Sequence, residues 1–390
     1  MRVLITHNYY LQLDAKQWEA QKPYAPLATL YASAALRKAG HEVRFHDVQF
    51  EASPEHFAAV LDKVKPDAVV LYEDGFNYLT KMCLTNMRDA AYTMIAMAKK
   101  VGAEVIISGS DSTDHFEEYL EKGADVIIFG EADETLLKLL EVGSGKSEVS
   151  GIAFKKGNEI IQKPRGPVLK DLDSLPFPAY DLLDIKPYQN AWKQHGYFSV
   201  NMATTRGCPF KCNWCAKPIY GNRYNSHSAK YIVELMQYMQ QFFSFDHIWF
   251  ADDIFGLKPG WVQEFSDEMK AAKLRIPFKI QSRADLLVVE NTVEALASAG
   301  CDEVWMGAES GSQKVLDAMD KGTKIEQIKE ATVLMKKHGI KPCFFLQFGY
   351  PGEDWEDIQA TLKMVDEWQP FDIGVSVSYP LPGTKFYENV

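Results

Sequence analysis

The residues with the clearest chemical potential in this sequence are three cysteines on one short loop. Cys208, Cys212 and Cys215 follow one another with C-x3-C-x2-C spacing in the stretch TTRGCPFKCNWCAKPIY, residues 204–220. Thiolates are soft ligands that select iron–sulfur clusters or zinc. A structural zinc site is closed by four ligands, and the next His or Cys, His227, lies outside this loop. Three thiolates on a four-iron cluster leave one iron open to bind and activate another molecule.

Composition and charge limit the kinds of partner that this protein takes. The 390 residues are 46% hydrophobic and carry a formal net charge of −11. Proteins that bind nucleic acid usually have an excess of basic residues, which this sequence does not have. A nucleic-acid partner is therefore not expected, and a small-molecule substrate is favoured. No apolar run reaches the roughly 18 residues of a membrane span. The three cysteines outside the loop, Cys83, Cys301 and Cys343, are isolated and read as buried small hydrophobes, so we expect a reducing cytoplasmic location.

Residues 1–149 alternate short apolar runs with amphipathic helical patterns. Near-continuous apolar strands separated by helices indicate a parallel sheet covered on both faces. The first strand is not followed by G-x-G-x-x-G, so a dinucleotide site of the usual kind has little support. Ligands bind such sheets at the carboxyl ends of the strands. The expected strands are 2–6, 42–46, 67–71, 104–108 and 125–129, and the expected helices are 27–39, 54–64, 88–101, 114–122 and 134–141.

A connector at 150–198 joins this half to a second region of alternating strands and helices. The stretch 151–164 reads as a β-hairpin that turns at Lys156-Gly157-Asn158, and the prolines that follow exclude a regular helix. From 199 to 390 six strand–helix units are expected. Chemistry in barrels of such units gathers at the carboxyl ends of the strands. The expected strands are 199–204, 247–251, 278–281, 303–307, 343–348 and 373–378.

The cysteine spacing, with Trp214 before the last cysteine, resembles the radical S-adenosylmethionine (radical SAM) superfamily. Three later stretches strengthen this resemblance: Gly307–Ser312, which matches G-x-E-S-G-S, Gln347–Glu353 and Tyr379–Thr384. The first half resembles the cobalamin-binding domain that precedes the barrel in one large subgroup, through PYAPLATLYASAALRKAGHEV and SGSDSTDHFEEYLEKGADVIIFGEADETLLKLL. The implied fold is α/β, with a Rossmann-like (flavodoxin-like) five-stranded parallel sheet followed by a partial (β/α)6 TIM-type radical SAM barrel.

The resemblance assigns a cofactor role to polar residues at the strand ends. Cys208, Cys212 and Cys215 would bind a [4Fe–4S] cluster whose open iron chelates SAM. One acid of the pair Asp252-Asp253 would approach the amino group of SAM; alternatively, it caps the next helix. Arg283 would approach the carboxylate or the ribose of SAM; alternatively, it pairs with a carboxylate of a helix. The implied SAM-contacting residues are Trp214, Asp252, Asp253, Ser282, Arg283, Glu309, Ser310, Gln347, Phe348 and Gly349.

The same resemblance implies a cobalamin site in the first half. The turns after the fourth and fifth strands would hold the nucleotide tail, and the loop 72–80 would face the lower side of the corrin. No His has Asp two residues before it, so D-x-H-x-x-G is absent and no histidine ligand to cobalt is expected. Gly-Ser-Asp-Ser replaces the family's usual Gly-Gly-Pro-His, which leaves a degenerate domain without corrin as an alternative. The implied contacts are Asn8, Tyr72, Gly75, Gly109, Ser110, Gly130 and Glu131.

The reaction implied is reductive cleavage of SAM to a 5′-deoxyadenosyl radical, followed by methylation of an unactivated carbon of a small molecule by way of cobalamin. A flavodoxin or ferredoxin would supply the electron. Oxidative cyclisation or rearrangement is the second reading, and a non-catalytic iron–sulfur or zinc protein is the third. Methylthiolation is disfavoured, since it needs three more cysteines in the first half and only Cys83 is there. Many relatives carry a further C-terminal region, so we expect a short member or a truncated chain. No catalytic side chain is identified.

Overall fold

The computed structural model describes residues 1–76, 84–143, 145–166, 168–217 and 219–390. The chain forms two compact units. The first comprises residues 1–200 with short pieces around 219–220 and 238–245, and the second comprises most of the chain from 201 onward. The predicted connector thus lies within the first unit.

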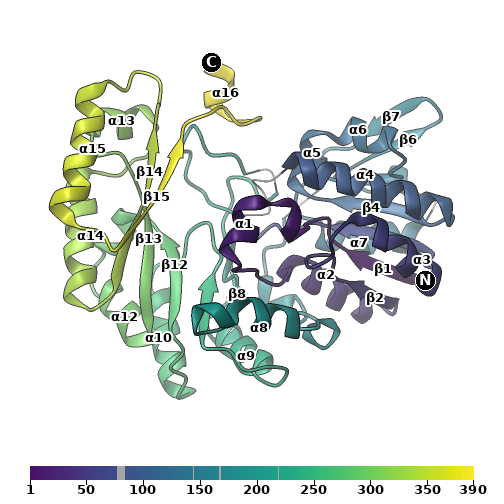
Figure 1. The fold of residues 1–390 in the computed structure, drawn as a ribbon, viewed down its shortest axis with the longest axis horizontal. Helices are drawn as coiled ribbons and strands as arrows, with labels where there is room; N and C mark the ends of the chain where they lie inside the picture. Colours follow the sequence, from purple (N-terminus) through teal and green to yellow (C-terminus); the bar gives the residue numbers. More distant parts are fainter. Residues whose placement is uncertain (77–83, 144, 167, 218) are drawn as a thin grey trace. The chain divides into compact units, whose positions relative to one another are not determined.

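A seven-stranded sheet forms the centre of the first unit (Figure 1). Its strand order is β2-β1-β3-β4-β5-β6-β7, in which β1 to β5 are parallel and the hairpin β6–β7 adds two antiparallel strands. The predicted five-stranded parallel sheet is confirmed, and the hairpin turns at Gly157 and Asn158 as expected. The strands are β1 (Arg2–Thr6), β2 (Glu42–His46), β3 (Ala68–Tyr72), β4 (Glu104–Ser108), β5 (Val126–Ile128), β6 (Ile152–Lys156) and β7 (Glu159–Gln162).

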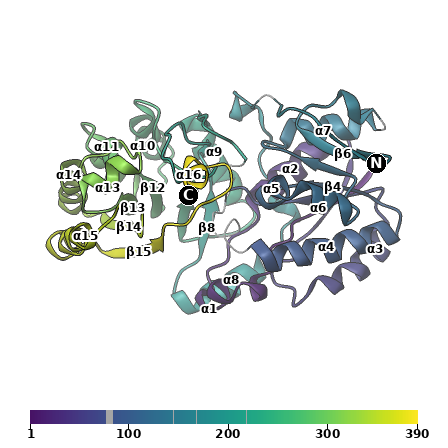
Figure 2. The same ribbon diagram turned by 90° about the horizontal axis from the view of Figure 1, so that it is seen from above.

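Helices cover both faces of this sheet, because its central strands are apolar on both sides. Figure 2 shows α2 (Leu27–Lys38) and α7 (Asp133–Val142) on one face and α3 (Phe57–Val64) and α4 (Leu84–Lys100) on the other. Every residue of β3 is buried, which explains its uninterrupted run of apolar side chains. Gly40, Gly102 and Gly123 have positive φ just after helices, as C-terminal glycines do.

Several short helices of the first unit differ from the sequence prediction. The single helix expected at 114–122 is divided at His115 into α5 (Ser110–Asp114) and α6 (Phe116–Glu121). Two further helices were not predicted, α1 (Ala15–Ala20) and α8 (Lys186–Trp192). The helix α1 buries none of its residues, so it has no apolar stripe to reveal it. Between 171 and 183 the chain makes only 3-10 turns, consistent with its prolines.

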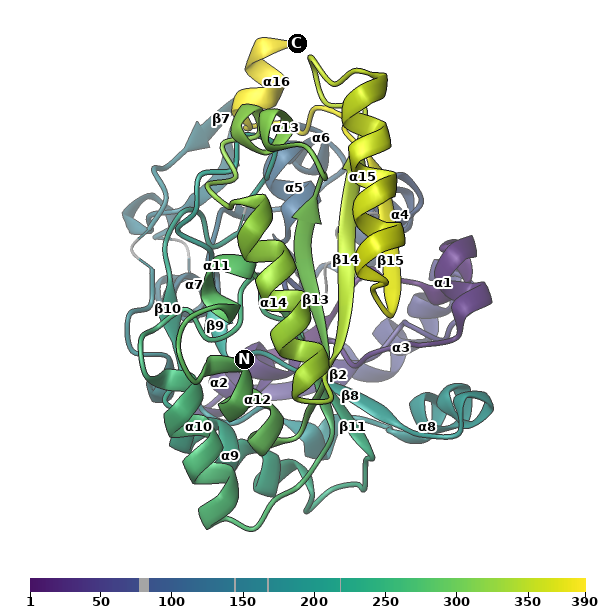
Figure 3. The same cartoon turned by 90° about the vertical axis from the view of Figure 1, so that its left-hand side faces the viewer.

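The second unit contains a six-stranded sheet with the order β15-β14-β13-β12-β11-β8. All six predicted strands are present, and Figure 3 shows α14 and α15 packed along one side of β13 to β15. The strands are β8 (Ser199–Met202), β11 (His247–Phe250), β12 (Phe278–Ser282), β13 (Cys301–Glu309), β14 (Lys341–Phe348) and β15 (Asp372–Val377); the helices between them are α9 (Ala229–Met239), α10 (Trp261–Ala271), α12 (Thr292–Ala299), α14 (Ile325–Lys337) and α15 (Trp355–Trp368).

Short segments follow the carboxyl ends of these strands and carry the polar motifs. A two-stranded ribbon of β9 (Thr205–Arg206) and β10 (Asn225–Ser226) flanks the cysteine loop. The short helices are α11 (Ala284–Leu287), α13 (Gln313–Ala318) and α16 (Lys385–Asn389). In the part of the chain that the structure describes, the helices are too short or too polar to cross a membrane.

Candidate active site

The cysteine loop is held in shape by one lysine. The Lys217 ammonium donates hydrogen bonds to the carbonyl oxygen of Cys208 at 3.1 Å, to the carbonyl of Phe210, and to Oδ1 of Asn222 at 2.8 Å. These bonds satisfy backbone carbonyls that would otherwise be unpaired in a loop without regular structure. Lys217 therefore folds the loop back on itself and brings a positive charge beside the thiols.

The three thiols influence one another electrostatically. Burial raises the pKa of Cys208, and it raises the pKa of Cys215 to about 12. Within that value, Lys217 lowers the pKa of Cys215, whereas Asp253, Cys212 and Cys208 act in the same direction as burial. Among the described residues, no three His, Cys, Asp or Glu side chains are grouped so that they could hold a single metal ion. The site instead offers three soft sulfur donors on a short loop, which suits an iron–sulfur cluster with one open iron.

Asn213 fastens the cysteine loop to the rest of the second unit. Its amide donates to the carbonyl of Ala318 at 2.7 Å, and its Oδ1 accepts from the Tyr350 hydroxyl at 2.6 Å. Its backbone nitrogen donates to Met319 at 3.1 Å, and its carbonyl accepts from Phe386 at 2.9 Å. Asn213 thus joins the segments after β13 and β14 to the loop. The sequence alone did not single it out, because its partners are far away along the chain.

Trp214 packs on a small apolar cluster beside this anchor. The cluster consists of Val315, Met319, Tyr350 and Phe386, and Trp214 is partly buried against it. Its indole Nε1 is buried and has no hydrogen-bond partner among the described residues. The predicted SAM contact through Trp214 stays a prediction, and the structure adds a packing role for its ring.

Asp252 is buried and oriented toward the strand that leads into the cysteine loop. Its Oδ1 accepts hydrogen bonds from the backbone nitrogens of Thr204 and Thr205, both at 2.7 Å, and from the Thr205 hydroxyl at 2.8 Å. Its Oδ2 accepts from the Thr204 hydroxyl at 2.9 Å. Burial raises the pKa of Asp252 to about 7 even though these four donors lower it. Asp252 therefore fixes the backbone of Thr204 and Thr205, at which the chain enters the cysteine loop.

Asp253, next in the chain, is exposed. Its charge contributes to the raised pKa values of Cys208 and Cys215. The alternative in which one of these acids caps the next helix is wrong, since Gly260 occupies the N-cap of α10. Of the two acids, Asp253 is the better placed to meet a ligand at the cysteine loop.

Arg283 connects the end of β12 to the cysteine loop. Its guanidinium lies 3.7 Å from the centre of the Phe210 ring, and its Nη1 lies 4.0 Å from the sulfur of Cys212. The same group pairs with Asp285 of α11 at 2.9 Å, so the helix-carboxylate alternative holds in this structure. Nη2 also donates to the Lys321 carbonyl at 2.8 Å. The Arg283 guanidinium is therefore held in place beside the sulfur of Cys212.

Glu309 and Lys321 form a buried ion pair after β13. Lys321 Nζ lies 2.6 Å from Glu309 Oε1, and 6.0 Å from the Trp214 ring centre. Burial lowers the pKa of Lys321, but the adjacent Glu309 carboxylate outweighs it and holds the pKa above its usual value. A Cβ at Gly307 would come 2.5 Å from Lys321 Nζ and 2.7 Å from Glu309 Oε1, so a larger residue there would displace the paired side chains. Sequence reasoning missed Lys321, which follows α13 as an ordinary-looking surface lysine.

The remainder of the G-x-E-S-G-S stretch serves packing. The Ser310 hydroxyl lies 3.1 Å from the Thr361 hydroxyl, and the Ser312 hydroxyl donates to Asp357 at 2.6 Å. A Cβ on Gly311 would meet the backbone of α15 at 2.4 Å, so the strand end lies directly against that helix. Ser310 is thus turned toward α15. Of the other predicted SAM contacts, Ser282 and Gln347 are buried, Phe348 is partly buried and Gly349 is exposed.

In the first unit, four of the predicted cobalamin contacts line one small cavity. Tyr72, Gly75, Gly109 and Gly130 surround a space of about 10 Å³. The Glu73 carboxylate lies against it and accepts from the backbone nitrogen of Ser110 at 2.7 Å and from its hydroxyl at 2.9 Å. A Cβ on Gly109 would come 2.1 Å from Glu73 Oε2. The two glycine turns therefore border a narrow cavity with room for little more than a water.

Two other predicted cobalamin residues, Asn8 and Glu131, do not line this cavity and make other contacts. The Asn8 amide donates to the Met87 carbonyl at 3.1 Å, and Glu131 accepts from the backbone nitrogen of Leu169 at 2.8 Å. Within the predicted loop 72–80, residues 77–80 are outside the described part of the chain, as is Cys83. Cys301 and Cys343 are buried, as expected.

Comparison with known protein families gives two matches in succession. The model of the B12 binding domain matches residues 19–140, and the model of the radical SAM superfamily matches residues 202–365. A radical SAM domain works with a [4Fe–4S] cluster and SAM, and a B12-binding domain holds cobalamin. The predicted set of cofactors and the predicted enzyme class are therefore confirmed at the level of the domains.

Two curated relatives match this sequence over nearly the whole chain. An uncharacterized methyltransferase of Pyrococcus horikoshii is 27% identical over 93% of this chain and 78% of its own length. An anaerobic magnesium-protoporphyrin IX monomethyl ester cyclase of Cereibacter sphaeroides is 26% identical over 100% of this chain, which spans 64% of that relative.

Among solved structures, the cobalamin-dependent radical SAM enzyme OxsB with aqua-cobalamin shares the fold, with a TM-score of 0.78 and 19% identity. That match covers 100% of this chain and 60% of the OxsB chain. With a B12 binding domain followed by a radical SAM domain in one chain, the protein belongs to the radical SAM enzymes that carry a B12-binding domain.

Proposed function

We propose that this enzyme transfers a methyl group from SAM, by way of cobalamin, to an unactivated carbon of a small molecule. The observation that carries the proposal is the presence of a B12-binding domain and a radical SAM domain in one chain. When bound, the cluster with SAM supplies a carbon-centred radical, and cobalamin supplies a carrier for methyl. The methyltransferase of Pyrococcus horikoshii, with 27% identity, supports the same outcome.

Cys208, Cys212 and Cys215 are proposed to hold the cluster, with Lys217 and Asn213 fixing their loop. The soft donor set and the bonds that close the loop support this role. Asp252 holds the backbone of Thr204 and Thr205 beneath the loop. This leaves the exposed Asp253 to meet the ammonium group of SAM, where a charge-assisted hydrogen bond is favourable.

The buried cations beside the loop are proposed to orient the carboxylate of SAM and to balance charge. Arg283 and Lys321 are both within the electrostatic reach of Cys212. A thiolate-bound cluster is anionic, so fixed cations stabilise its reduced form. Trp214, Ser282, Glu309, Ser310, Gln347, Phe348 and Gly349 remain proposed SAM contacts.

The first unit is proposed to hold cobalamin without a histidine on cobalt. The turns at Gly109 and Gly130 are proposed to lie beside the nucleotide tail, with Tyr72, Gly75 and Ser110 close to them. Asn8 and Glu131 remain proposed contacts at the same sheet edge. The electron donor is proposed to be a flavodoxin or ferredoxin, and the location the cytoplasm, where a reduced cluster and free thiols persist.

Anaerobic turnover with SAM labelled in its methyl group tests the reaction. The protein is reconstituted with iron, sulfide and cobalamin, then given candidate substrates and a reductant. Methyl transfer predicts label in the product, together with 5′-deoxyadenosine and S-adenosylhomocysteine. The reaction proposal fails if substrate is consumed with 5′-deoxyadenosine and methionine but without label.

Oxidative cyclisation or rearrangement is the second candidate. The cyclase of Cereibacter sphaeroides matches over all of this chain, and this match supports cyclisation as an alternative reaction. It predicts an unlabelled product in the experiment above, with no S-adenosylhomocysteine. A third possibility, a binding protein without catalysis, predicts no 5′-deoxyadenosine under any of these conditions.

A further inference from the structure

One face of the six-stranded sheet in the second unit is accessible to solvent. Along β12, β13 and β14, buried side chains alternate with partly exposed ones. The buried set, for example Val304 and Phe344, packs against the covering helices. In a closed barrel the opposite face is filled by side chains, whereas here the strand order ends at β15 and at β8. The partly exposed residues of this inner face include Lys279, Gln281, Glu303, Trp305, Gly307 and Phe345.

Two aromatic rings lie against each other on the inner face. The ring centres of Trp305 on β13 and Phe345 on β14 are 4.8 Å apart, and the ring planes are inclined by 30°, which is a stacked arrangement. The indole Nε1 of Trp305 donates to Oε1 of Glu303 at 2.6 Å, so a hydrogen bond within its own strand fixes the orientation of the ring. A partly exposed and oriented indole is a surface on which another ring can stack.

Glycines on the two neighbouring strands leave room for these rings. Gly374 on β15 and Gly307 on β13 are both partners of Phe345 in the sheet register. A Cβ on Gly374 would lie 3.1 Å from Cδ1 of Phe345 and 3.2 Å from Cζ3 of Trp305, so the indole extends across β14 toward β15. We call the two rings with their flanking glycines, Trp305, Phe345, Gly307 and Gly374, the aromatic platform.

The aromatic platform adjoins the predicted SAM residues at the strand ends. Gln347 follows Phe345 by two residues on β14, which places both on the same face about 7 Å apart. A Cβ on Gly307 would lie 2.7 Å from Oε1 of Glu309, so the Glu309 carboxylate borders the platform. A molecule stacked on the platform would therefore extend toward the strand ends, where chemistry in such barrels takes place.

Charge does not select the molecule that binds here. Lys279 and Glu303 are partners in the sheet register and place one cation beside one acid. Glu303 accepts the hydrogen bond from Trp305, and Lys279 Nζ lies 5.6 Å from the centre of the Trp249 ring. Because the two charges offset each other, the distinctive feature of this part of the inner face is its pair of rings.

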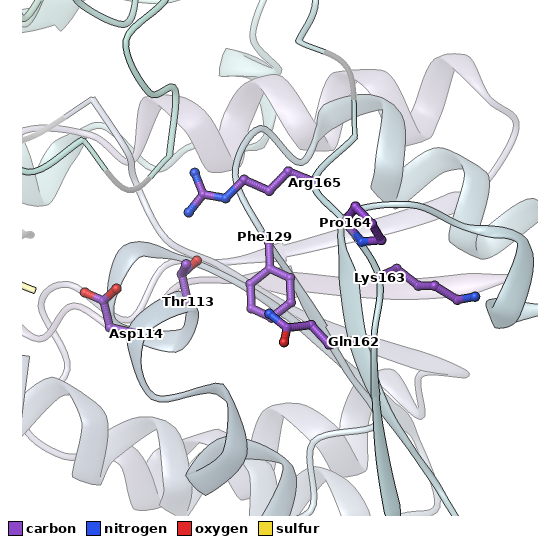
Figure 4. A pocket seen from close by; sticks show the side chains of 7 residues that line it. All are labelled: Thr113, Asp114, Phe129, Gln162, Lys163, Pro164 and Arg165. Atoms are coloured by element: carbon purple, nitrogen blue, oxygen red, sulfur yellow. The ribbon is translucent and has the colours of Figure 1, made fainter. Parts of the chain in front are cut away.

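The pocket of about 460 Å³ on the first unit has a different lining (Figure 4). Figure 4 shows the Phe129 ring among polar and charged side chains, with Lys163 and Arg165 extending to opposite sides. The Phe129 ring meets Phe116 edge-on, with the ring planes at 86°. This pocket thus offers charged groups rather than a stacked pair, and Phe129 provides a control residue for the aromatic platform.

We propose that the aromatic platform binds the substrate through a planar, conjugated ring that stacks on Trp305 and Phe345. The inference rests on the proposed function, because it names the chemical class of the substrate of that reaction. A planar ring gains a stacking interaction in addition to the burial of its apolar surface. A saturated ring of the same size gains the burial alone. The expected substrate is therefore an aromatic or conjugated molecule.

A planar probe and its saturated analogue test this class. The full chain is reconstituted anaerobically with iron, sulfide and cobalamin, and equilibrium dialysis gives its dissociation constants for 2-naphthoate and for decahydro-2-naphthoate. The two probes have the same carbon skeleton and the same charge, and burial alone favours the more hydrophobic, saturated one. The wild type is expected to bind 2-naphthoate about five- to tenfold tighter. Equal affinities, or tighter binding of the saturated probe, would overturn the proposal.

Three variants locate the binding on the platform. Trp305→Leu keeps an apolar surface without a ring, so it should weaken 2-naphthoate binding about fivefold and change the binding of the saturated probe less than twofold. Trp305→Phe keeps a ring and should fall between Trp305→Leu and the wild type. Gly374→Val should also weaken 2-naphthoate binding, because the added side chain displaces both rings while they remain present. Circular dichroism checks that each variant is folded.

Phe129→Leu is the control, since it removes a ring from the other unit. It should leave the binding of both probes unchanged. Equal losses for the two probes in Trp305→Leu would show that stacking does not contribute, and the proposal would be wrong. A loss of 2-naphthoate binding in Phe129→Leu but not in Trp305→Leu would place the probe in the first unit and would also overturn it.

A separate measurement distinguishes this inference from the function on which it rests. The reconstituted protein is given SAM and a reductant without either probe, and 5′-deoxyadenosine is measured. If 5′-deoxyadenosine forms while the planar probe is not preferred, the substrate class is wrong and the enzymatic function stands. A preference for the planar probe without any 5′-deoxyadenosine would overturn the enzymatic function and leave the platform as a binding site for planar rings.

Discussion

Lys321 Nζ lies 2.6 Å from Oε1 of Glu309, and the two side chains are only 7% and 6% exposed. Glu309 also has a left-handed backbone with φ of 60°. A non-glycine residue keeps such a conformation only where its surroundings hold it, and that cost is common at functional sites. The buried pair therefore fixes a carboxylate at the strand end that the G-x-E-S-G-S stretch occupies.

Breaking this pair from one side should be more damaging than removing it. Lys321→Met leaves the Glu309 carboxylate buried without a partner and should cost about 3–5 kcal/mol of stability, as should Glu309→Met by leaving the ammonium. The double variant should be clearly more stable than the sum of the single losses predicts. Chemical denaturation of the three variants measures this difference. Strictly additive losses would mean that the two groups do not stabilise one another.

Asp252 should make stability depend on pH. Its pKa of about 7 in the folded protein lies above the ordinary value of 3.8, so the folded state binds more protons than the unfolded state between these values. Stability should therefore fall as pH rises from about 4 to 7, by about 1.4 kcal/mol per pH unit, and level off above pH 7.

Asp252→Asn is the comparison for this pH effect, because it resembles the protonated acid in shape. Its amide can accept from Thr205 and donate to the Thr204 hydroxyl. Subtracting the two unfolding profiles removes the other titrating groups. A difference that does not change between pH 5 and pH 7 would show that Asp252 is ionised throughout.

Each of the three loop cysteines should be needed for the cluster. Cys208→Ala, Cys212→Ala and Cys215→Ala should lose most of the iron and sulfide after anaerobic reconstitution, because one missing thiolate leaves a further iron without a protein ligand. Cys301→Ala, which changes a buried cysteine of β13, is the control and should retain them. Iron and sulfide analysis with the visible absorbance of the cluster measures the outcome. Retention of a full cluster in any of the three variants would exclude that cysteine as a ligand.

Arg283 should raise the reduction potential of the cluster. Its guanidinium is fixed 4.0 Å from the Cys212 sulfur, and a nearby cation favours the more negative, reduced form. Arg283→Gln should shift the potential downward, and Arg283→Lys should shift it less. Lys211→Ala, an exposed charge on the same loop, is the control. Potentiometric titration followed by electron-spin resonance measures the reduction potentials. Equal shifts in Arg283→Gln and Lys211→Ala would show that the overall charge, and not the position of Arg283, sets the potential.

The sequence by itself determined the two α/β regions, their strands and the cysteine loop. These features are local: buried parallel strands are continuous apolar runs, helices repeat their apolar residues, and C-x3-C-x2-C is read from one stretch. The strands β8 and β11 to β15 lie where the pattern predicted them. The division of one expected helix at His115 and the exposed helix α1 were not visible, since neither leaves a clear apolar period.

Only the tertiary structure decided which side chain of each motif faces the loop. Asp252 and Asp253 are neighbours of identical chemistry, yet Asp252 is buried against Thr204 and Thr205 while Asp253 is exposed. Lys321 and Asn213 belong to the site because of contacts with residues that are distant along the chain, and a local sequence pattern does not reveal such contacts. The physical reason is that burial and hydrogen bonding depend on which segments meet when the sheet closes. Residue type and spacing specify the available chemistry, and packing selects the atoms that can perform it.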